Sequence, residues 1–248
     1  MKAIRDSEQR RIIVALDVES PREARRVVRT LAPYVQCFKV GKQLFVAAGP
    51  DLIRYIHRQG RDVFLDLKFH DIPNTVAKAT IEAARLGVRF VDLHAAGGPA
   101  MMRTACAELR RVCRAERLRP PVVLAVTVLT SLDEVDLRAV GVRDTPAVQV
   151  RRLARLAARC GMDGIVCSPR EIATIRRALG RRITIVTPGV RPPGTAAGDQ
   201  KRVLTPAQAV AAGADYLVVG RPVLQAADPA AMVRTIAADM RRGRRALR

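Results

Sequence analysis

Short apolar runs alternate with longer amphipathic segments along the whole chain, and this alternation restricts the possible folds more than any other feature. Eight such runs are typical of buried strands, at residues 11–16, 35–40, 63–67, 88–93, 121–128, 163–167, 183–187 and 216–219. Helical patterns lie between them, some with clear start signals such as Ser20-Pro21 and Pro73. Eight strand–helix pairs in 248 residues predict an α/β fold closed into a (β/α)8 TIM barrel.

The same alternation predicts the domain organisation. No shift in composition and no linker divides the chain, so we expect one barrel domain over residues 1–248, with 1–10 and 243–248 as terminal tails. Helices are expected at residues 21–31, 43–59, 73–86, from 98 to about 117, 147–160, 169–179, 206–212 and 229–242, with a longer connection at 133–146. An open doubly wound sheet is the alternative, but it would usually show a G-x-G-x-x-G turn after the first strand, and none is present there.

The composition limits the classes of function. A net charge of +21 would suit a nucleic-acid-binding protein, but the arginines are dispersed over helix faces and aromatic residues make up only 3% of the chain. We therefore expect no nucleic-acid partner. No apolar run is long enough to cross a bilayer and the first residues do not resemble a signal peptide, so we expect no membrane partner and a cytoplasmic location.

The cysteines and histidines carry no metal signature. The five cysteines include no C-x-x-C pair, which favours reduced and mostly buried thiols. The three histidines show no H-E-x-x-H spacing. We expect neither a metal nor a disulfide framework.

The segment at residues 64–76, FLDLKFHDIPNTV, places charged side chains at the end of a buried strand. Asp66 and Lys68 are two residues apart, so on a strand both side chains point to the same face. Only six of the 44 basic residues are lysines, and a lysine, unlike an arginine, can give up a proton. Lys39, Asp66, Lys68 and Asp71 form a candidate set of alternating charges, which could stabilise a carbanion and then protonate it. A purely structural ion-pair network is the alternative interpretation.

A second candidate subsite lies after the last two predicted strands. The loop at residues 188–202 and the Gly220-Arg221 turn lie where barrels often bind a substrate phosphate through backbone N–H groups. The Arg221 guanidinium could add a charged contact to such a phosphate. An ordinary turn with a surface arginine is the alternative.

Several motifs together resemble one enzyme family over residues from about 11 to about 238. They are ALDV at Asp17, FKVGK at Lys39, DLKFHDIPNT, the LTS at residues 129–131, TPGVRPPG and the GRP at residues 220–222. This set resembles orotidine 5′-phosphate decarboxylases of the bacterial type. The resemblance implies cofactor-free decarboxylation of orotidine 5′-monophosphate to uridine 5′-monophosphate, by homodimers that share their active sites.

The resemblance also implies a role for each matching residue. Lys68 would be the proton donor to C6 of the pyrimidine, Asp66 the carboxylate beside the leaving CO2, and Lys39 the residue that braces Asp66 and touches the ribose. Asp71 and Thr75 would reach in from the partner subunit. The remaining substrate-binding residues would be Asp17 at the ribose, Thr130 and Ser131 at the pyrimidine, Pro188 in the closing loop, and Arg191, Gln200, Gly220 and Arg221 at the phosphate.

A sugar-phosphate lyase or decarboxylase of the same barrel superfamily remains the nearest alternative, through its own DxKxxD element. Those enzymes resemble this chain but use magnesium and have a glutamate where this chain has Lys39. An ammonium group at that position would repel a divalent cation.

Overall fold

The computed structural model describes residue 4, residues 6–192 and residues 204–245. Eight parallel strands form one closed barrel in sequence order, with β8 hydrogen-bonded to β1. The strands are β1 (Ile12–Ala15), β2 (Cys37–Gly41), β3 (Asp62–Phe69), β4 (Phe90–His94), β5 (Val122–Val126), β6 (Gly164–Val166), β7 (Thr184–Thr187) and β8 (Tyr216–Val219). The predicted (β/α)8 barrel is confirmed.

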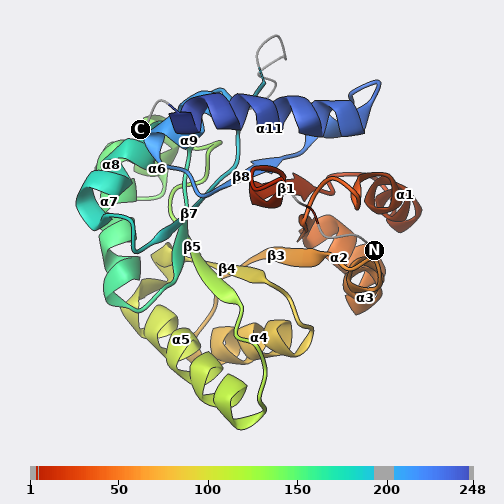
Figure 1. Ribbon diagram of the computed structural model, residues 1–248. Helices are drawn as coiled ribbons and strands as arrows, with labels where there is room; N and C mark the ends of the chain where they lie inside the picture. The colour runs from red at the N-terminus through yellow and green to blue at the C-terminus, as the bar shows by residue number, and fades with distance from the viewer. Residues whose placement is uncertain (1–3, 5, 193–203, 246–248) are drawn as a thin grey trace.

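Helices surround the strands (Figure 1). They are α1 (Pro21–Leu31), α2 (Lys42–Ala48), α3 (Pro50–Arg58), α4 (Pro73–Arg85), α5 (Gly98–Ala115), α6 (Glu134–Ala139), α7 (Pro146–Arg159), α8 (Ile172–Leu179), α9 (Pro206–Ala212), α10 (Arg221–Leu224) and α11 (Pro229–Arg245), with short 3-10 turns at Gln9–Arg11, Ala95–Gly97 and Pro169–Glu171. The α1 helix begins as its sequence predicts, because Ser20 accepts a hydrogen bond from the Glu23 N–H and Pro21 takes the first helical position.

Apolar side chains fill the barrel on both faces of the sheet. The outward-facing residues join the helices in one large buried cluster, which includes Val14, Phe38 and Leu65. The inward-facing residues form a second, smaller cluster, which includes Ile13, Phe64, Phe90 and others. Because both faces of a parallel barrel are buried, the strands read as continuous apolar runs in the sequence.

Three predicted features differ from the structure. The helix expected at 43–59 is divided into α2 and α3 at Gly49-Pro50, because Gly49 has a φ of 55° and Pro50 has no N–H to continue the helix. The connection at 133–146 contains α6, which begins with a capping box at Asp133. The turn at residues 220–221 leads into the short helix α10.

The expected terminal tails are also partly wrong. Helix α11 continues to Arg245, three residues beyond its predicted end. Glu8, expected in a tail, is only 1% exposed and forms ion pairs with Arg11 and Arg244. A buried carboxylate needs partners of opposite charge, and here they come from both ends of the chain.

Two smaller expectations can be compared with the described residues. All five cysteines are buried and free, as predicted. Among residues 4, 6–192 and 204–245, no helix is both long enough and apolar enough to cross a membrane.

Candidate active site

The candidate site begins where the apolar interior of the barrel ends. Along β3, Phe64 points into the barrel, so Asp66, two residues later, also points inward and lies closer to the carboxyl end of the strand. The same spacing places Lys39 after Cys37 on β2, and Asp92 after Phe90 on β4. A polar layer therefore covers the apolar layer at the carboxyl end of the barrel, where barrel enzymes have their active sites.

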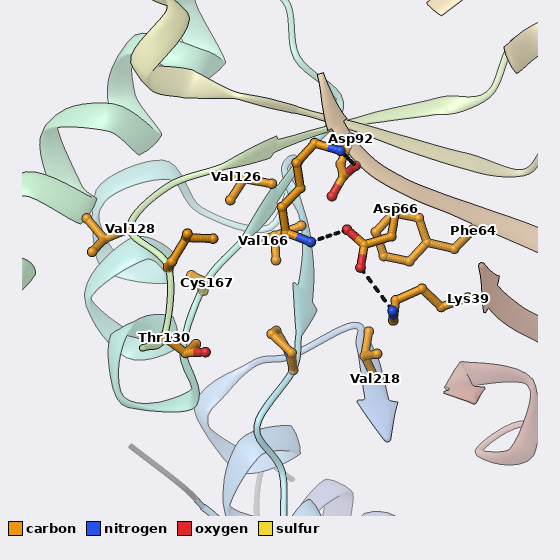
Figure 2. Close-up of a pocket in the computed structure, with 13 residues that line it drawn as sticks. Lys39, Phe64, Asp66, Asp92, Val126, Val128, Thr130, Val166, Cys167 and Val218 are labelled. Carbon is orange, nitrogen blue, oxygen red and sulfur yellow. Dashed lines mark hydrogen bonds and ion pairs between the residues drawn. The ribbon is translucent and has the colours of Figure 1, made fainter. Parts of the chain in front are cut away.

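Four side chains from three segments form a row of alternating charge. The Lys39 Nζ lies 3.0 Å from Oδ1 of Asp17 and 3.1 Å from Oδ2 of Asp66. The Lys68 Nζ donates a hydrogen bond to the other Asp66 oxygen, Oδ1. Figure 2 shows Asp66 between the two ammonium groups, with Lys39 on one side. The Asp66 carboxylate is thus held by a cation at each oxygen.

Neighbouring opposite charges keep the buried groups of this row ionised. Burial alone would raise the pKa of Asp66, but the ammonium of Lys39, with help from Lys68, lowers that pKa well below its ordinary value. Burial would likewise lower the pKa of Lys39, but the carboxylates of Asp66 and Asp17 raise it. At neutral pH Asp66 is therefore ionised and Lys39 is protonated, although both are about nine-tenths buried.

Lys68 has an unusual backbone conformation. Its φ is 50°, in the left-handed region that side chains other than glycine rarely adopt, at a cost of about 1–2 kcal/mol. The pairing of β3 with β4 shifts register between Leu65 and Phe69, so Lys68 lies in a β-bulge. Such bulges often redirect a side chain beside an active site.

A cavity of about 160 Å³ adjoins this row. Its walls are mainly apolar, with Phe64, Val126, Val166 and Val218 among them. Lys39, Asp66, Lys68, Asp92, Thr130 and Pro188 also line it. A second, more open depression shares Lys39, Asp66 and Lys68 and continues towards Asp17. An ammonium in a mainly apolar cavity can stabilise negative charge that develops on a bound molecule, because little water screens the interaction.

Comparisons with known proteins show the family of the chain. Residues 10–236 match the model of the orotidine 5′-phosphate decarboxylase / HUMPS family. The chain belongs to this family. The family resemblance inferred from the sequence motifs, and with it the assignment as a carboxy-lyase, is confirmed.

Named relatives in the family cover nearly the whole chain. Orotidine 5′-phosphate decarboxylase from Syntrophotalea carbinolica is 53% identical, over 94% of this chain and 95% of its own. The same enzyme from Moorella thermoacetica is 52% identical, over 93% and 92%. A crystal structure of orotidine 5′-phosphate decarboxylase from Lactobacillus acidophilus has a TM-score of 0.81, 37% identity, and coverage of 93% of this chain and 99% of that chain.

The family motifs at the strand ends lie around the cavity. Thr130 and Pro188 line it, whereas Ser131 is exposed beside Thr130. Gly220 ends the β8 segment next to Asp17, and a Cβ at Gly220 would lie 3.2 Å from an Asp17 carboxylate oxygen. The absence of a side chain at Gly220 therefore leaves room for Asp17.

The residues of the predicted phosphate subsite are only partly described. Arg191 follows β7 and is 9% exposed, and its backbone N–H donates to Leu204 O at 3.0 Å. Arg221 is the first residue of α10, directly after β8, and is half-buried. Gln200 lies outside the described residues, as do residues 193–202 of the predicted closing loop.

Within this chain, Asp71 lies apart from the row formed by Asp17, Lys39, Asp66 and Lys68. It is exposed at the start of the segment leading to α4, and its carboxylate accepts a hydrogen bond from the Ile72 N–H at 2.6 Å. Within the described chain no ion pair joins Asp71 to Lys68, and Asp17 takes the outer acidic position of the row. Thr75 is also exposed, and neither residue lines the cavity.

Asp92 was missed by the sequence analysis. Asp92 is 1% exposed, lines the cavity, and accepts the Lys68 backbone N–H at 2.8 Å. Burial, together with the charges of His70 and Lys68, lowers the pKa of His94 to about 4, so His94 is neutral at pH 7. An acid in the second half of the predicted strand 88–93, two residues before a histidine, was the available signal for Asp92.

Metal ligation by acidic or histidine side chains is not found in the part of the chain that the structure describes. Among the described residues, no group of three or more His, Cys, Asp or Glu side chains is placed to hold a metal ion.

Proposed function

We propose that the chain catalyses the decarboxylation of orotidine 5′-monophosphate to uridine 5′-monophosphate, with Lys68 as the proton donor. The observation that supports this most strongly is the Lys68 ammonium, paired with Asp66 and facing a mainly apolar cavity at the carboxyl end of the barrel. Family membership supports the substrate.

In the proposed reaction the bond between C6 of the pyrimidine and its carboxylate carbon breaks. CO2 leaves, and the electron pair of the bond stays on C6. The Lys68 ammonium stabilises this negative charge and then transfers one proton to C6, which gives uridine 5′-monophosphate and a neutral amine. Solvent reprotonates the amine after the product leaves.

Asp66 and Lys39 support the proton donor. Lys39 and Lys68 keep Asp66 ionised in a buried position, so Asp66 presents a fixed negative charge next to the site of the leaving carboxylate. Asp66 in turn holds the Lys68 ammonium by a hydrogen bond. A preorganised ion row does not have to rearrange when charge develops on the substrate.

The remaining predicted residues would bind the two ends of the substrate. Thr130 and Ser131 are proposed to contact the pyrimidine, and Asp17 with Lys39 the ribose. Arg191, Gln200, Gly220 and Arg221 are proposed to bind the phosphate end, with Pro188 in the closing loop. Phosphate binding would close the loop at residues 188–202, so that binding energy remote from C6 helps to assemble the site.

We also propose a homodimer in which Asp71 and Thr75 of each subunit complete the partner's site. Both side chains are exposed at the start of α4, and next to them Ile72 exposes 65% of its surface, an apolar side chain suited to an interface. The enzyme is proposed to act in the cytoplasm as one domain spanning residues 1–248, without nucleic-acid or membrane partners.

The proton-donor role can be tested with Lys68→Ala. Loss of orotidine 5′-monophosphate is followed by absorbance in metal-free buffer. Because general acid catalysis and charge stabilisation are both lost, we expect kcat to fall by at least about 10³-fold, with the circular dichroism spectrum unchanged. Near-normal turnover by a folded Lys68→Ala protein would contradict the assignment.

The shared site can be tested by mixing two inactive variants, Lys68→Ala and Asp71→Asn. In a mixed dimer, one site receives Lys68 from one subunit and Asp71 from the other, and so is intact. For random mixing we expect about a quarter of the wild-type activity, because half of the dimers each have one intact site. No recovery in demonstrably mixed dimers would rule out a site shared in this way.

A further inference from the structure

Asp92 has no role in the site as described so far, yet its position is unusual. It lies on β4, is 1% exposed and points into the cavity, close to Asp66 (Figure 2). Its Oδ1 accepts the Lys68 backbone N–H at 2.8 Å. Its Oδ2 is buried, and the Asp66 carboxylate beside it raises the pKa of Asp92 through both its negative charge and a hydrogen bond. A second buried carboxyl group next to Asp66 is costly, so it calls for an explanation.

The hydrogen bond from Lys68 explains why an acceptor is needed there. The bulge in β3 interrupts the pairing with β4 between Leu65 and Phe69, so the Lys68 N–H is not paired in the regular ladder. Lys68 also has a φ of 50°, which must be held by its surroundings. The Asp92 carboxyl oxygen takes the place of the missing strand carbonyl.

We propose that Asp92 is a positioning residue, which holds the bulge that aims the Lys68 ammonium at Asp66 and the cavity. The inference rests on the proposed role of Lys68 as proton donor. It assigns to Asp92 no contact with the reacting atoms. Its effect reaches the substrate only through the placement of Lys68.

The charge state of Asp92 shows which substitution should preserve this role. Burial raises its pKa well above the ordinary value, and the nearby negative charge of Asp66 adds to this effect. A neutral carboxyl resembles an asparagine side chain in shape and in having one acceptor oxygen. Asn at position 92 should therefore still accept the Lys68 N–H, whereas Val or Ala cannot.

Asp163 provides a matched control. Its Oδ2 accepts the backbone N–H of Val123 at 2.9 Å, so it too ties a side-chain carboxylate to a neighbouring strand. It directly precedes β6 and so lies at the opposite end of the barrel from Lys68. Removing the Asp163 carboxylate therefore loses a hydrogen bond of the same type, together with an ion pair to Arg110, outside the site.

The experiment measures kcat, the dissociation constant of the product uridine 5′-monophosphate, and the urea midpoint for Asp92→Val, Asp92→Asn and Asp163→Ala. We expect Asp92→Val to lower kcat about 100-fold, because a displacement of about 1 Å can cost that much. Product affinity should change by less than about threefold, because Lys68 placement matters most in the transition state. Asp92→Asn should keep kcat within about tenfold of wild type, and Asp163→Ala should lower the urea midpoint while leaving kcat within about threefold.

Other outcomes would overturn the inference. It fails if Asp92→Val keeps kcat near wild type, if kcat and product affinity fall together, or if Asp92→Asn is as inactive as Asp92→Val. Asp92→Ala replaces Asp92→Val under the same criteria if the valine variant does not fold. An active Lys68→Ala protein would instead reject the proposed role of Lys68 as the proton donor, whatever the Asp92 variants show.

Discussion

Replacing Lys39 with methionine tests the energetics of the ion row most directly. The Lys39 Nζ lies 3.1 Å from Oδ2 of Asp66, and the Lys39 residue is 9% exposed. At an effective dielectric constant of about 20, two charges at this distance attract each other by about 5 kcal/mol, before the cost of removing each ion from water. Methionine fills a similar volume without a charge, so Lys39→Met removes the attraction and leaves Asp66 buried with Lys68 alone.

The expected loss follows from these opposing effects. Breaking a buried ion pair by removing one partner typically costs about 3–5 kcal/mol. Because Lys68 still contacts Asp66, we expect a loss in the free energy of unfolding near the lower end, about 3 kcal/mol at pH 7. Domains are commonly stable by about 5–15 kcal/mol, so the variant should still fold.

The assay is urea unfolding followed by circular dichroism, since the chain has no tryptophan to report by fluorescence. Protein concentration is held fixed, because a dimer would unfold in a concentration-dependent way. The exposed Lys42, three residues further along, gives the control Lys42→Met, which should change the free energy of unfolding by less than about 0.5 kcal/mol.

The pH dependence of the free energy of unfolding tests the same ion pair, and its direction follows from the pKa of Asp66. The pKa of Asp66 is lowered on folding, so its stabilisation is present above its unfolded pKa of about 3.9 and is lost as the pH falls below that value. The difference between wild type and Lys39→Met should therefore be full at pH 7 and should narrow below about pH 4. A loss at pH 7 no larger than that of Lys42→Met would refute the view that Lys39 offsets the burial of Asp66.

Two further expectations concern the same site. The folded-state pKa of Asp92 is raised, so native Asp92 retains a proton that the unfolded chain releases above about pH 4. The free energy of unfolding of the wild type should therefore fall relative to that of Asp92→Asn as the pH rises towards 7, by at most about 1.4 kcal/mol per pH unit. The same difference between the urea midpoints of the two proteins at pH 4.5 and at pH 7 would contradict this. Activity should not change after treatment with EDTA, because ammonium groups hold both oxygens of Asp66; loss of activity that magnesium restores would favour the magnesium-dependent lyases of the same superfamily.

Much of the site could be predicted from local sequence patterns. The spacing of two between Asp66 and Lys68, at the end of a buried strand, was sufficient to propose a shared face. Strand ends of a parallel barrel converge on one rim, so Asp17, Lys39 and Thr130 could be assigned to the same end. The family motifs added the substrate and a role for each residue.

Other parts depended on contacts between distant segments. The bulge at Lys68 and the hydrogen bond to Asp92 join residues on two strands, and no residue type in β3 signals a positive φ at a lysine. The helix break at Gly49-Pro50 was visible as a residue pair, but the amphipathic pattern continued across it. The contact of Asp17 with Lys39 likewise reflects spatial position and not spacing in the sequence.

The sequence by itself determined the barrel and the rim on which the charged residues lie, because strand and helix periodicity are local and the order of strands follows the order of the chain. Only the tertiary structure decided which carboxylate meets which ammonium. In the register of β2 and β3, Lys39 is paired with Phe64, and Gly41 is paired with Asp66. The long Lys39 side chain therefore extends towards the carboxyl end of the barrel to reach Asp66. A slip of one residue between strands turns every side chain to the opposite face of the sheet, and this register is fixed by packing across the whole barrel.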